Sequence, residues 1–395
     1  MIKSCFKGIW NYIKRADILL WLLLAAISAY SLLLLRSVDS ATGSSYFRTQ
    51  AMAVALGIIG AIVISLMDYG ELANFWYLFA GASVFLMIYT ALFGDRALGS
   101  GGVDARAWIN IGGFSFQTSE AVKIAFILTF AKHLDSLRKR GWIDRPLHVV
   151  LLAVHALVPM GLCEIQGDTG AAIVFFAMFV VMSLAAGVKL RYFAILGGLV
   201  LLALPLLWQF VMEDYQKLRF IALFNLDDPN VQMYDGYQQY QGRISIGSGK
   251  LTGQGLFHGS RVADGIVPFQ QSDYIFSVAG EELGFVGCSL ILLLLFLFML
   301  KALHVAHSSR DDLGKYVCFG YFGIIALQSI SNIGMCLAVL PAMGVTLPFF
   351  SAGGSSAVCM YLGFGLVQSV FMRRKESDGL RLKRRPFQRV FPAGR

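Results

Sequence analysis

Apolar stretches long enough to cross a lipid bilayer recur along nearly the whole of this 395-residue chain. A transmembrane helix needs about 17 to 25 mostly apolar residues, and these stretches meet that length. Only 14% of the residues are Asp, Glu, Lys or Arg, against about 25% in an ordinary soluble domain. The chain is therefore predicted to be a membrane protein, and a soluble multi-domain protein is excluded.

The apolar stretches are predicted to be helices, because hydrocarbon offers no partner to a backbone group left unpaired within its own segment. A transmembrane β-barrel would instead show short alternating stretches. We expect an all-α, polytopic fold of about ten transmembrane helices. The predicted spans are 18–35, 51–67, 75–93, 119–134, 147–163, 170–186, 192–212, 274–300, 316–340 and 353–371.

Three regions follow from these spans: an N-terminal segment 1–17, a helical domain 18–371 and a basic tail 372–395. The first span is predicted to be a retained helix, because it is longer than a signal-peptide core and lacks a small-residue cleavage site. The fourth span is the most polar, since Glu120, Lys123 and Lys132 interrupt it.

Lys and Arg are distributed unequally between the two sides of the membrane that the predicted spans define. The side that holds both termini carries 23 of them and the other side nine. Because positive residues collect in cytoplasmic segments, both termini are predicted to face the cytoplasm. The same asymmetry explains the net charge of +9 without nucleic acid. The basic tail is interpreted as an anchor on anionic lipid, with a protein-docking tail as the alternative.

The segment 213–273 is the longest predicted connection and lies on the outer side. Eight Gly occur between positions 236 and 265, mixed with Ser, Gln and apolar residues. Such a segment can bend sharply and re-enter a cavity lined by protein. The alternative is a floppy extracellular loop. The six Cys are scattered without metal-ligand spacing, so neither a metal site nor a disulfide is predicted.

Ionisable residues gather at the outer ends of the predicted spans. Glu120 and Lys123 are three residues apart on one helix, where they can neutralise each other. Asp168 lies in an outward turn, and Asp273 stands where the long loop becomes the eighth span. A charge inside a span costs about 2.5 to 3.5 kcal/mol on insertion scales, so these residues are candidates for function.

Two arginines of the predicted outer loops, Arg48 and Arg106, lie on the same face of the membrane. Arginine suits phosphate oxygens because its guanidinium offers a fork of donors. A carboxylate beside it can act as a general base toward a sugar hydroxyl. A site at the outer edge suits a substrate with a lipid tail and an exposed polar head.

Four motifs spread over the chain resemble the shape, elongation, division and sporulation family of bacterial cell-wall synthesis, the RodA, FtsW and SpoVE proteins. They are RAWINIGGFSFQTSEAVKIA from Arg106, QGDTGAA from Gln166, ISIGSGKLTGQG continuing through PFQQSDYIFSVAGEELGFVG, and NIGMCLAVLPAMGVTLPFFSAGGSS from Asn332. The resemblance implies a ten-helix peptidoglycan glycosyltransferase in the bacterial cytoplasmic membrane. It would polymerise lipid II with a class B penicillin-binding protein, the transpeptidase, as its partner.

The resemblance also implies roles for particular residues. Asp273 would be the catalytic carboxylate that takes the proton from the acceptor sugar hydroxyl. Glu120 would orient Lys123, and Asp168 would hold the cavity or an acceptor. The cations expected to stabilise the leaving pyrophosphate are Arg48, Arg106, Lys123 and Arg219; Gln117, Ser119 and Ser272 complete the substrate-binding candidates. A divalent cation such as magnesium or manganese could assist, although no sequence feature fixes its position.

Within the family, the short N-terminal segment and the string GQGLFHGS look closer to the elongation-type RodA than to the division-type FtsW. A division- or sporulation-type member with the same chemistry is the first alternative. A flippase for lipid-linked precursors is the second, but its charges should continue toward the cytoplasmic side. A non-catalytic scaffold is the third, and it would not require Asp273.

Overall fold

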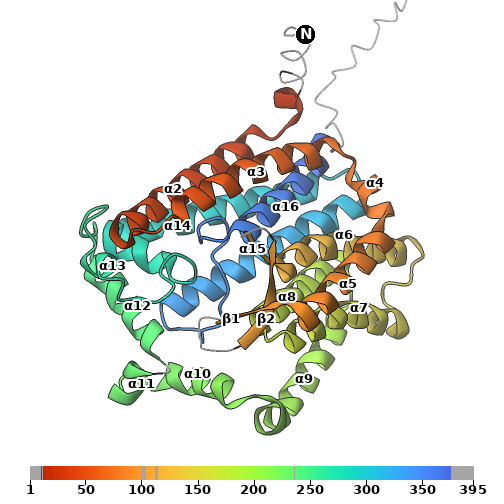
Figure 1. Cartoon of the computed structure of the whole chain (residues 1–395). Helices are drawn as coiled ribbons and strands as arrows, with labels where there is room; N and C mark the ends of the chain where they lie inside the picture. The colour runs from red at the N-terminus through yellow and green to blue at the C-terminus, as the bar shows by residue number, and fades with distance from the viewer. Residues whose placement is uncertain (1–9, 11, 99–103, 112–113, 235, 375–395) are drawn as a thin grey trace, which may run out of the picture.

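Two helices pack closely together in the computed structural model, which describes residues 10, 12–98, 104–111, 114–234 and 236–374. Helix α3 (Tyr46–Leu66) lies against α16 (Gly354–Met372), although the two are far apart in sequence (Figure 1). A Cβ atom at Gly57 would lie 2.7 Å from the Tyr361 ring, and one at Gly365 would lie 2.8 Å from the Ala61 carbonyl oxygen. Small residues thus let the backbones approach, as is common between membrane helices.

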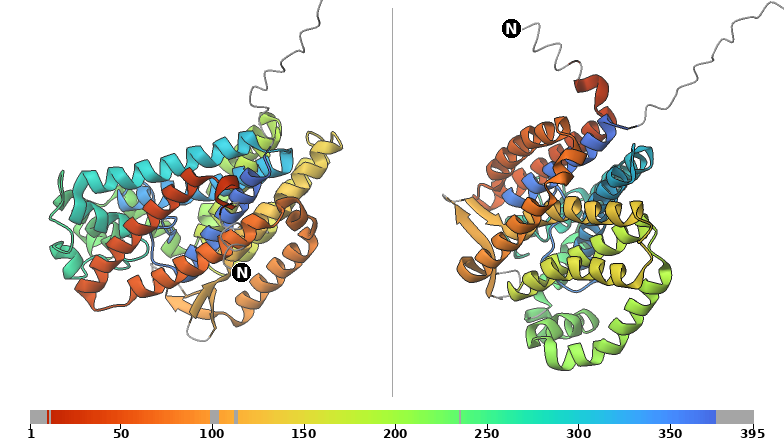
Figure 2. Two further views of the ribbon diagram at one scale, coloured as in Figure 1. Left: turned by 90° about the horizontal axis from the view of Figure 1, so that it is seen from above. Right: turned by 90° about the vertical axis from the view of Figure 1, so that its right-hand side faces the viewer.

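The remaining helices confirm the all-α prediction. Within the described residues, nine helices are long and apolar enough to cross a membrane: α2 (Ile18–Thr42), α3, α5 (Trp76–Phe93), α7 (Pro146–Ile165), α8 (Thr169–Ala186), α9 with its π-helical end (Leu190–Phe210), α14 (Ile275–Ser308), α15 (Asp312–Cys336) and α16. The predicted fourth span is α6 (Thr118–Lys139), whose length suffices but whose composition is more polar. Helix α14 runs nearly the whole length of the molecule (Figure 2).

The predicted bounds of the connection between the first two spans, residues 36–50, are wrong. Helix α2 continues to Thr42 and α3 begins at Tyr46, so the turn between them is much shorter than 36–50. The Asp39 carboxylate accepts hydrogen bonds from the Tyr46 and Phe47 N–H groups at 2.9 and 2.8 Å, which starts α3 early. Arg48 therefore lies in the first turn of a helix instead of a loop.

The two ends of the bundle differ. At one end, here called the terminal end, Asp17 before α2 exchanges backbone hydrogen bonds with the Gln368 amide of α16, at 3.0 and 3.1 Å. The Asp17 carboxylate also pairs with Lys301 of α14 at 2.8 Å. The opposite end, here called the loop end, carries the long connections.

A three-stranded antiparallel sheet, which was not predicted, lies at the loop end. Its strands are β1 (Asp95–Leu98), β2 (Asp104–Ile111) and β3 (Phe114–Gln117), in that order. Strand β3 runs directly into α6, so Gln117 is fixed at the start of that helix. The Arg106 N–H donates to the Gln166 carbonyl at 2.9 Å, which joins β2 to the end of α7.

In its described residues the segment 213–273 is helical over much of its length, so the interpretation as a floppy loop is wrong. It forms α10 (Asp214–Phe224), α11 (Pro229–Met233), α12 (Tyr237–Ser248) and α13 (Ser260–Ala263). Helix α12 lies against α14, whereas α9 to α11 stand along one edge of the molecule (Figures 1 and 2). No residue of α9 is buried.

The Gly-rich part of this segment inserts at a break in α14. Gly284 has φ 65° and ψ −157°, which interrupts the helical hydrogen bonds. The freed carbonyls of Glu281 and Glu282 accept from the N–H groups of Gln254 and Gly255 at 2.9 and 3.0 Å. Two further bonds, from Phe285 to Lys250 and from Val286 to Leu251, use the freed N–H groups. Protein thus satisfies non-helical backbone at membrane depth, as the bilayer requires.

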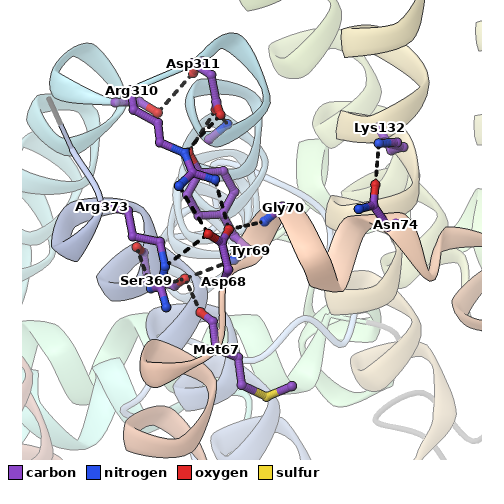
Figure 3. A network of polar contacts seen from close by, with 12 residues as sticks. Met67, Asp68, Tyr69, Gly70, Asn74, Lys132, Arg310, Asp311, Ser369 and Arg373 are labelled. Carbon is purple, nitrogen blue, oxygen red and sulfur yellow. Dashed lines mark hydrogen bonds and ion pairs between the residues drawn. The ribbon is translucent and has the colours of Figure 1, made fainter.

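A network of charges closes the terminal end (Figure 3). Asp68, between α3 and α4 (Tyr69–Asn74), accepts two hydrogen bonds from the Arg310 guanidinium at 3.0 and 3.1 Å. It also pairs with Arg373 at the end of α16 at 3.3 Å. Burial opposes ionisation of Asp68, but the Gly70 N–H and the two arginines outweigh it, so the pKa of Asp68 lies below its ordinary value.

We expect Asp68→Asn to lower the free energy of unfolding at neutral pH by about 1 to 2 kcal/mol, because a partly exposed charge loses two arginine partners. The lowered pKa makes this contribution present above the unfolded pKa of about 3.9 and lost as the pH falls through the native value. Thermal melting in detergent micelles across this pH range measures it. Asp214→Asn, at a fully exposed carboxylate, is the control; a constant difference at every pH contradicts the prediction.

Candidate active site

The turn that precedes α14 is held by three consecutive carbonyls. The Gln271 carbonyl accepts from the Ala352 N–H at 2.8 Å. The Ser272 carbonyl accepts from the Ser351 hydroxyl at 2.5 Å, and the Asp273 carbonyl from the Asn332 amide at 2.7 Å. The backbone on either side of the Asp273 side chain is therefore fixed by the segment that leads into α16 and by α15.

Asp273 itself is buried, with 7% of its surface exposed, at the loop end beside the start of α14. The charges of Asp273 and of Arg219 both act on the buried phenol of Tyr274, which places the carboxylate and the guanidinium around one side chain. Arg219, on α10, also donates from Nη1 to the Ala342 carbonyl at 3.0 Å. The long connection thus brings a cation near the same tyrosine as the carboxylate that the sequence singled out.

A second polar cluster lies where α6 and α8 begin. The Asp168 Oδ2 atom accepts from the Gln117 amide and from the Ser119 hydroxyl, both at 2.9 Å. Its Oδ1 atom accepts from the Ala171 N–H at 3.0 Å and caps α8. Gln117 and Ser119, predicted from the first motif, therefore meet Asp168, predicted from the second.

Glu120 and Lys123 form the predicted ion pair. The Glu120 Oε1 and Lys123 Nζ atoms are 2.8 Å apart, and the side chains are 6% and 2% exposed. Because each charge neutralises the other in a nearly dry site, Lys123 does not present a free positive charge. The orienting role expected for Glu120 agrees with this geometry, but a direct grip of Lys123 on phosphate does not.

The segment before α16 joins the two clusters. Ser351 and Ala352 bind the turn of Asp273, as described above. Three residues further on, the Ser355 hydroxyl accepts from the Gln117 N–H at 3.2 Å. Between them, the Gly353 N–H donates to the Gln50 Oε1 atom of α3 at 3.2 Å. The two clusters are therefore connected by hydrogen bonds between residues of α3, α15, α16 and the starts of α6, α8 and α14.

Sequence reasoning did not assign Gln50, Asn332, Ser351 or Ser355 to the site. Three of them belong to the fourth motif, so its Asn and Ser residues were an available signal. Gln50 had no comparable signal, since it is a single amide at the edge of an apolar run. Arg48 remains exposed on α3, and the hydrogen bonds and ion pairs of the described residues do not connect it with either cluster.

A preformed site for a divalent cation is not found within the described part of the chain, where no three His, Cys, Asp or Glu side chains lie close enough to hold a metal. Both oxygens of Asp168 already accept hydrogen bonds. The residues around the site therefore do not fit the cation that was considered from the sequence.

The fold and this site define a multi-pass membrane protein with a buried carboxylate at one end of the bundle. A family model described as "Cell cycle protein", covering FtsW, RodA and SpoVE, matches residues 14–376. The chain belongs to this family, which confirms the resemblance read from the four motifs.

Relatives and solved structures agree with this assignment. The probable peptidoglycan glycosyltransferase FtsW of Geobacter metallireducens is 30% identical, over 94% of this chain and 98% of that protein. The peptidoglycan glycosyltransferase MrdB of Escherichia coli K12 is also 30% identical, over 93% and 96%. A chain from a peptidoglycan synthase complex that coordinates polymerization and crosslinking superposes with a TM-score of 0.78, at 28% identity and over 91% and 99% of the two chains. The rod shape determining protein RodA of Thermus thermophilus gives 0.67, at 28% identity and over 91% and 98%.

We expect Asn332→Leu to lower the free energy of unfolding by about 2 to 4 kcal/mol. The Asn332 amide donates to the carbonyls of both Asp273 and Val345, and each buried carbonyl left without a partner costs about 1 to 3 kcal/mol. Thermal melting in detergent measures the loss. Asn225→Leu, which removes one exposed hydrogen bond to the Ile221 carbonyl, should change the free energy of unfolding little. Equal effects of the two substitutions would contradict the stabilising role of the buried Asn332 hydrogen bonds.

Proposed function

We propose that the chain is a peptidoglycan glycosyltransferase that polymerises lipid II, with Asp273 as the general base. The observation that carries the proposal is the buried Asp273 carboxylate, clamped through its own backbone and accompanied by Arg219. The names of the relatives support the same class of reaction. A scaffold would have no need for a buried carboxylate held in this way.

In the proposed reaction, Asp273 accepts the proton of the acceptor sugar hydroxyl while that oxygen bonds to the anomeric carbon of the donor. The bond from this carbon to the pyrophosphate oxygen breaks, and the polyprenyl pyrophosphate leaves with the electron pair. Arg219 stabilises negative charge electrostatically. Gln117, Ser119 and Asp168 hold the sugar-binding side, and Glu120 with Lys123 keeps the start of α6 neutral and rigid.

The proposed orientation places the loop end outside the bacterial cytoplasmic membrane and both termini in the cytoplasm. The excess of Lys and Arg on the terminal side supports it. A substrate whose tail stays in the outer leaflet then reaches the site from the bilayer. The polar head meets Asp273 without crossing the membrane.

Polymerisation is preferred to lipid flipping because hydrogen bonds and ion pairs tie the helices together at the terminal end. Asp17 joins α2 to α14 and α16, and Asp68 joins α3 to Arg310 and Arg373. A flippase must open each side in turn, which would break these bonds in every cycle. A reaction at the loop end leaves them intact.

The elongation-type role stays a prediction of the sequence. Relatives named FtsW and MrdB match at the same 30% identity. Restoration of rod shape in cells that lack their elongation-type member, but not of division in cells that lack the division-type member, would support it. The opposite pattern would assign the chain to division.

The proposed partner is a class B penicillin-binding protein, and its transmembrane helix fits a groove between α14 and α15. This apolar groove has a volume of about 790 Å³ and is lined by Phe296, Ala326 and Ile330, among others. Phe296 and Ile330 are 54% and 61% exposed. The groove also contains the Ser329 hydroxyl, which is buried without a hydrogen-bond partner. A helix with a polar group at this depth would satisfy it.

We expect Asp273→Asn to lower the rate of lipid II polymerisation by about 100-fold or more, the usual range for loss of a general base. Purified protein with labelled lipid II, alone and with its transpeptidase, is assayed by gel analysis of glycan chains. Asp264→Asn, at an exposed carboxylate of the same connection, should leave the rate unchanged. Equal polymer from wild type and Asp273→Asn would remove Asp273 from the mechanism.

We expect Ala326→Trp to weaken co-purification of the class B transpeptidase by about tenfold or more, because the indole would occupy space in the groove that Ala326 lines. Leu201→Trp, on the exposed helix α9, is the matched control. Co-purification at the wild-type level by Ala326→Trp, with the melting temperature preserved, would place the partner on another surface.

A further inference from the structure

The first turn of α16 offers backbone donors that the chain leaves unused. Gly353 stands at the N-cap position, where it has no side chain to accept a hydrogen bond. Among the described residues, no acceptor is bound by the N–H groups of Gly354, Ser355 and Ser356. Gly353, Gly354 and Ser356 are partly exposed, so a ligand can reach them. The start of this 19-residue helix also carries the positive end of its dipole.

An unpaired amide of Gln50 lies beside these donors. The Gln50 side chain is 1% exposed, its Oε1 atom accepts from the Gly353 N–H, and its Nε2 atom has no partner. The Gly353 donor fixes which end of the carboxamide is the oxygen. The Nε2 donor is therefore held next to the start of α16. A buried donor without an acceptor is destabilising, and a ligand acceptor would remove that cost.

A second buried donor lies on the neighbouring helix. Thr118, at the start of α6, is 0% exposed and its hydroxyl has no partner. The residue before it, Gln117, donates its N–H to Ser355. Two helix starts, α6 and α16, thus meet where three kinds of donor remain unpaired: backbone N–H, amide and hydroxyl.

We propose that the start of α16, with Gln50 and Thr118, binds the pyrophosphate group of the lipid-linked sugar donor. The proposal rests on the proposed function, because it names the part of the site that holds the leaving group. Unpaired N–H groups and a helix dipole form a ready site for phosphate oxygens. The site lies between the turn of Asp273 and the cluster around Asp168, between the carboxylate and the sugar-binding side.

Neutral donors carry this site, in place of two of the four cations expected from the sequence. Lys123 is neutralised by Glu120, and Arg48 is not connected to the clusters. Donors fixed before the reaction need no reorganisation as charge develops on the leaving oxygen. The geometry is also selective, since a pyrophosphate offers several oxygens to several donors, whereas a phospholipid phosphodiester offers two.

The test is equilibrium binding of fluorescent polyprenyl pyrophosphate to the full chain in nanodiscs, with unlabelled phosphatidylglycerol and inorganic pyrophosphate as competitors. Gln50→Glu keeps the acceptor for the Gly353 N–H and replaces the amide donor with a negative oxygen. Thr49→Glu places the same charge on the exposed face of the same helix and is the matched control. Gly354→Pro removes one unused N–H at the first helical position, where proline is well tolerated.

We expect Gln50→Glu to weaken binding of polyprenyl pyrophosphate by about tenfold or more, Gly354→Pro to weaken it less, and Thr49→Glu to leave it within about twofold. Inorganic pyrophosphate should compete, and phosphatidylglycerol should not. Wild-type affinity in both Gln50→Glu and Gly354→Pro overturns the site, as does equal competition by phosphatidylglycerol. If Gln50→Glu does not fold, as judged by thermal melting, Gly354→Pro alone decides.

The same assay separates this site from the proposed function. Asp273→Asn should bind polyprenyl pyrophosphate like the wild type while losing polymerisation. Polymerisation that survives Asp273→Asn would refute the general base and leave the anion site standing. Wild-type binding by both Gln50→Glu and Gly354→Pro, together with loss of polymerisation in Asp273→Asn, would refute the anion site alone.

Discussion

The structure depends on how backbone groups freed at the loop end of the bundle find hydrogen-bond partners. A helix can cross the bilayer because it pairs its own backbone, and each interruption must be paired by other protein groups. At Gly284 the partners come from the loop around Gln254. At the turn before Asp273 they come from α15 and from the segment before α16. These pairings fix the carboxylate, because the same bonds that satisfy the backbone also determine where its side chain lies.

The helices could be predicted from the sequence because each apolar run is long and bounded by polar residues. Even α6 was found, because an apolar run remains on it although Glu120, Lys123 and Lys132 interrupt that run. The motifs indicated Gln117, Ser119 and Asp168 one by one, but not that their side chains would meet. The sheet could not be predicted, because its strands are four to eight residues long and lack the pattern of a buried strand. The early start of α3 depends on the contact of Asp39 with Tyr46, which no local pattern records.

The roles of the charged residues were harder to predict than their positions. A lysine at the outer end of a span suggests a phosphate ligand, but a buried carboxylate three residues away removes its net charge. The ion pair has the lower free energy, because an isolated charge in a dry site is strongly disfavoured. Arg219 differs because it comes from α10, outside the densely packed bundle, and its charge acts on Tyr274 together with that of Asp273. Sequence shows which charges enter the membrane, whereas only packing shows which remain available.

The contrast between Asp68 and Gln50 indicates why the reaction belongs at the loop end. Asp68 has two arginines, the Gly70 N–H and a lowered pKa, so its bonding capacity is used within the protein. Gln50, buried to the same degree as the core, keeps a donor without an acceptor. Stability alone would favour an acceptor on a neighbouring side chain for that donor, or an apolar residue in place of Gln50. An unpaired donor retained beside a helix start and a clamped carboxylate is the arrangement expected where a charged substrate group must enter, be held and leave.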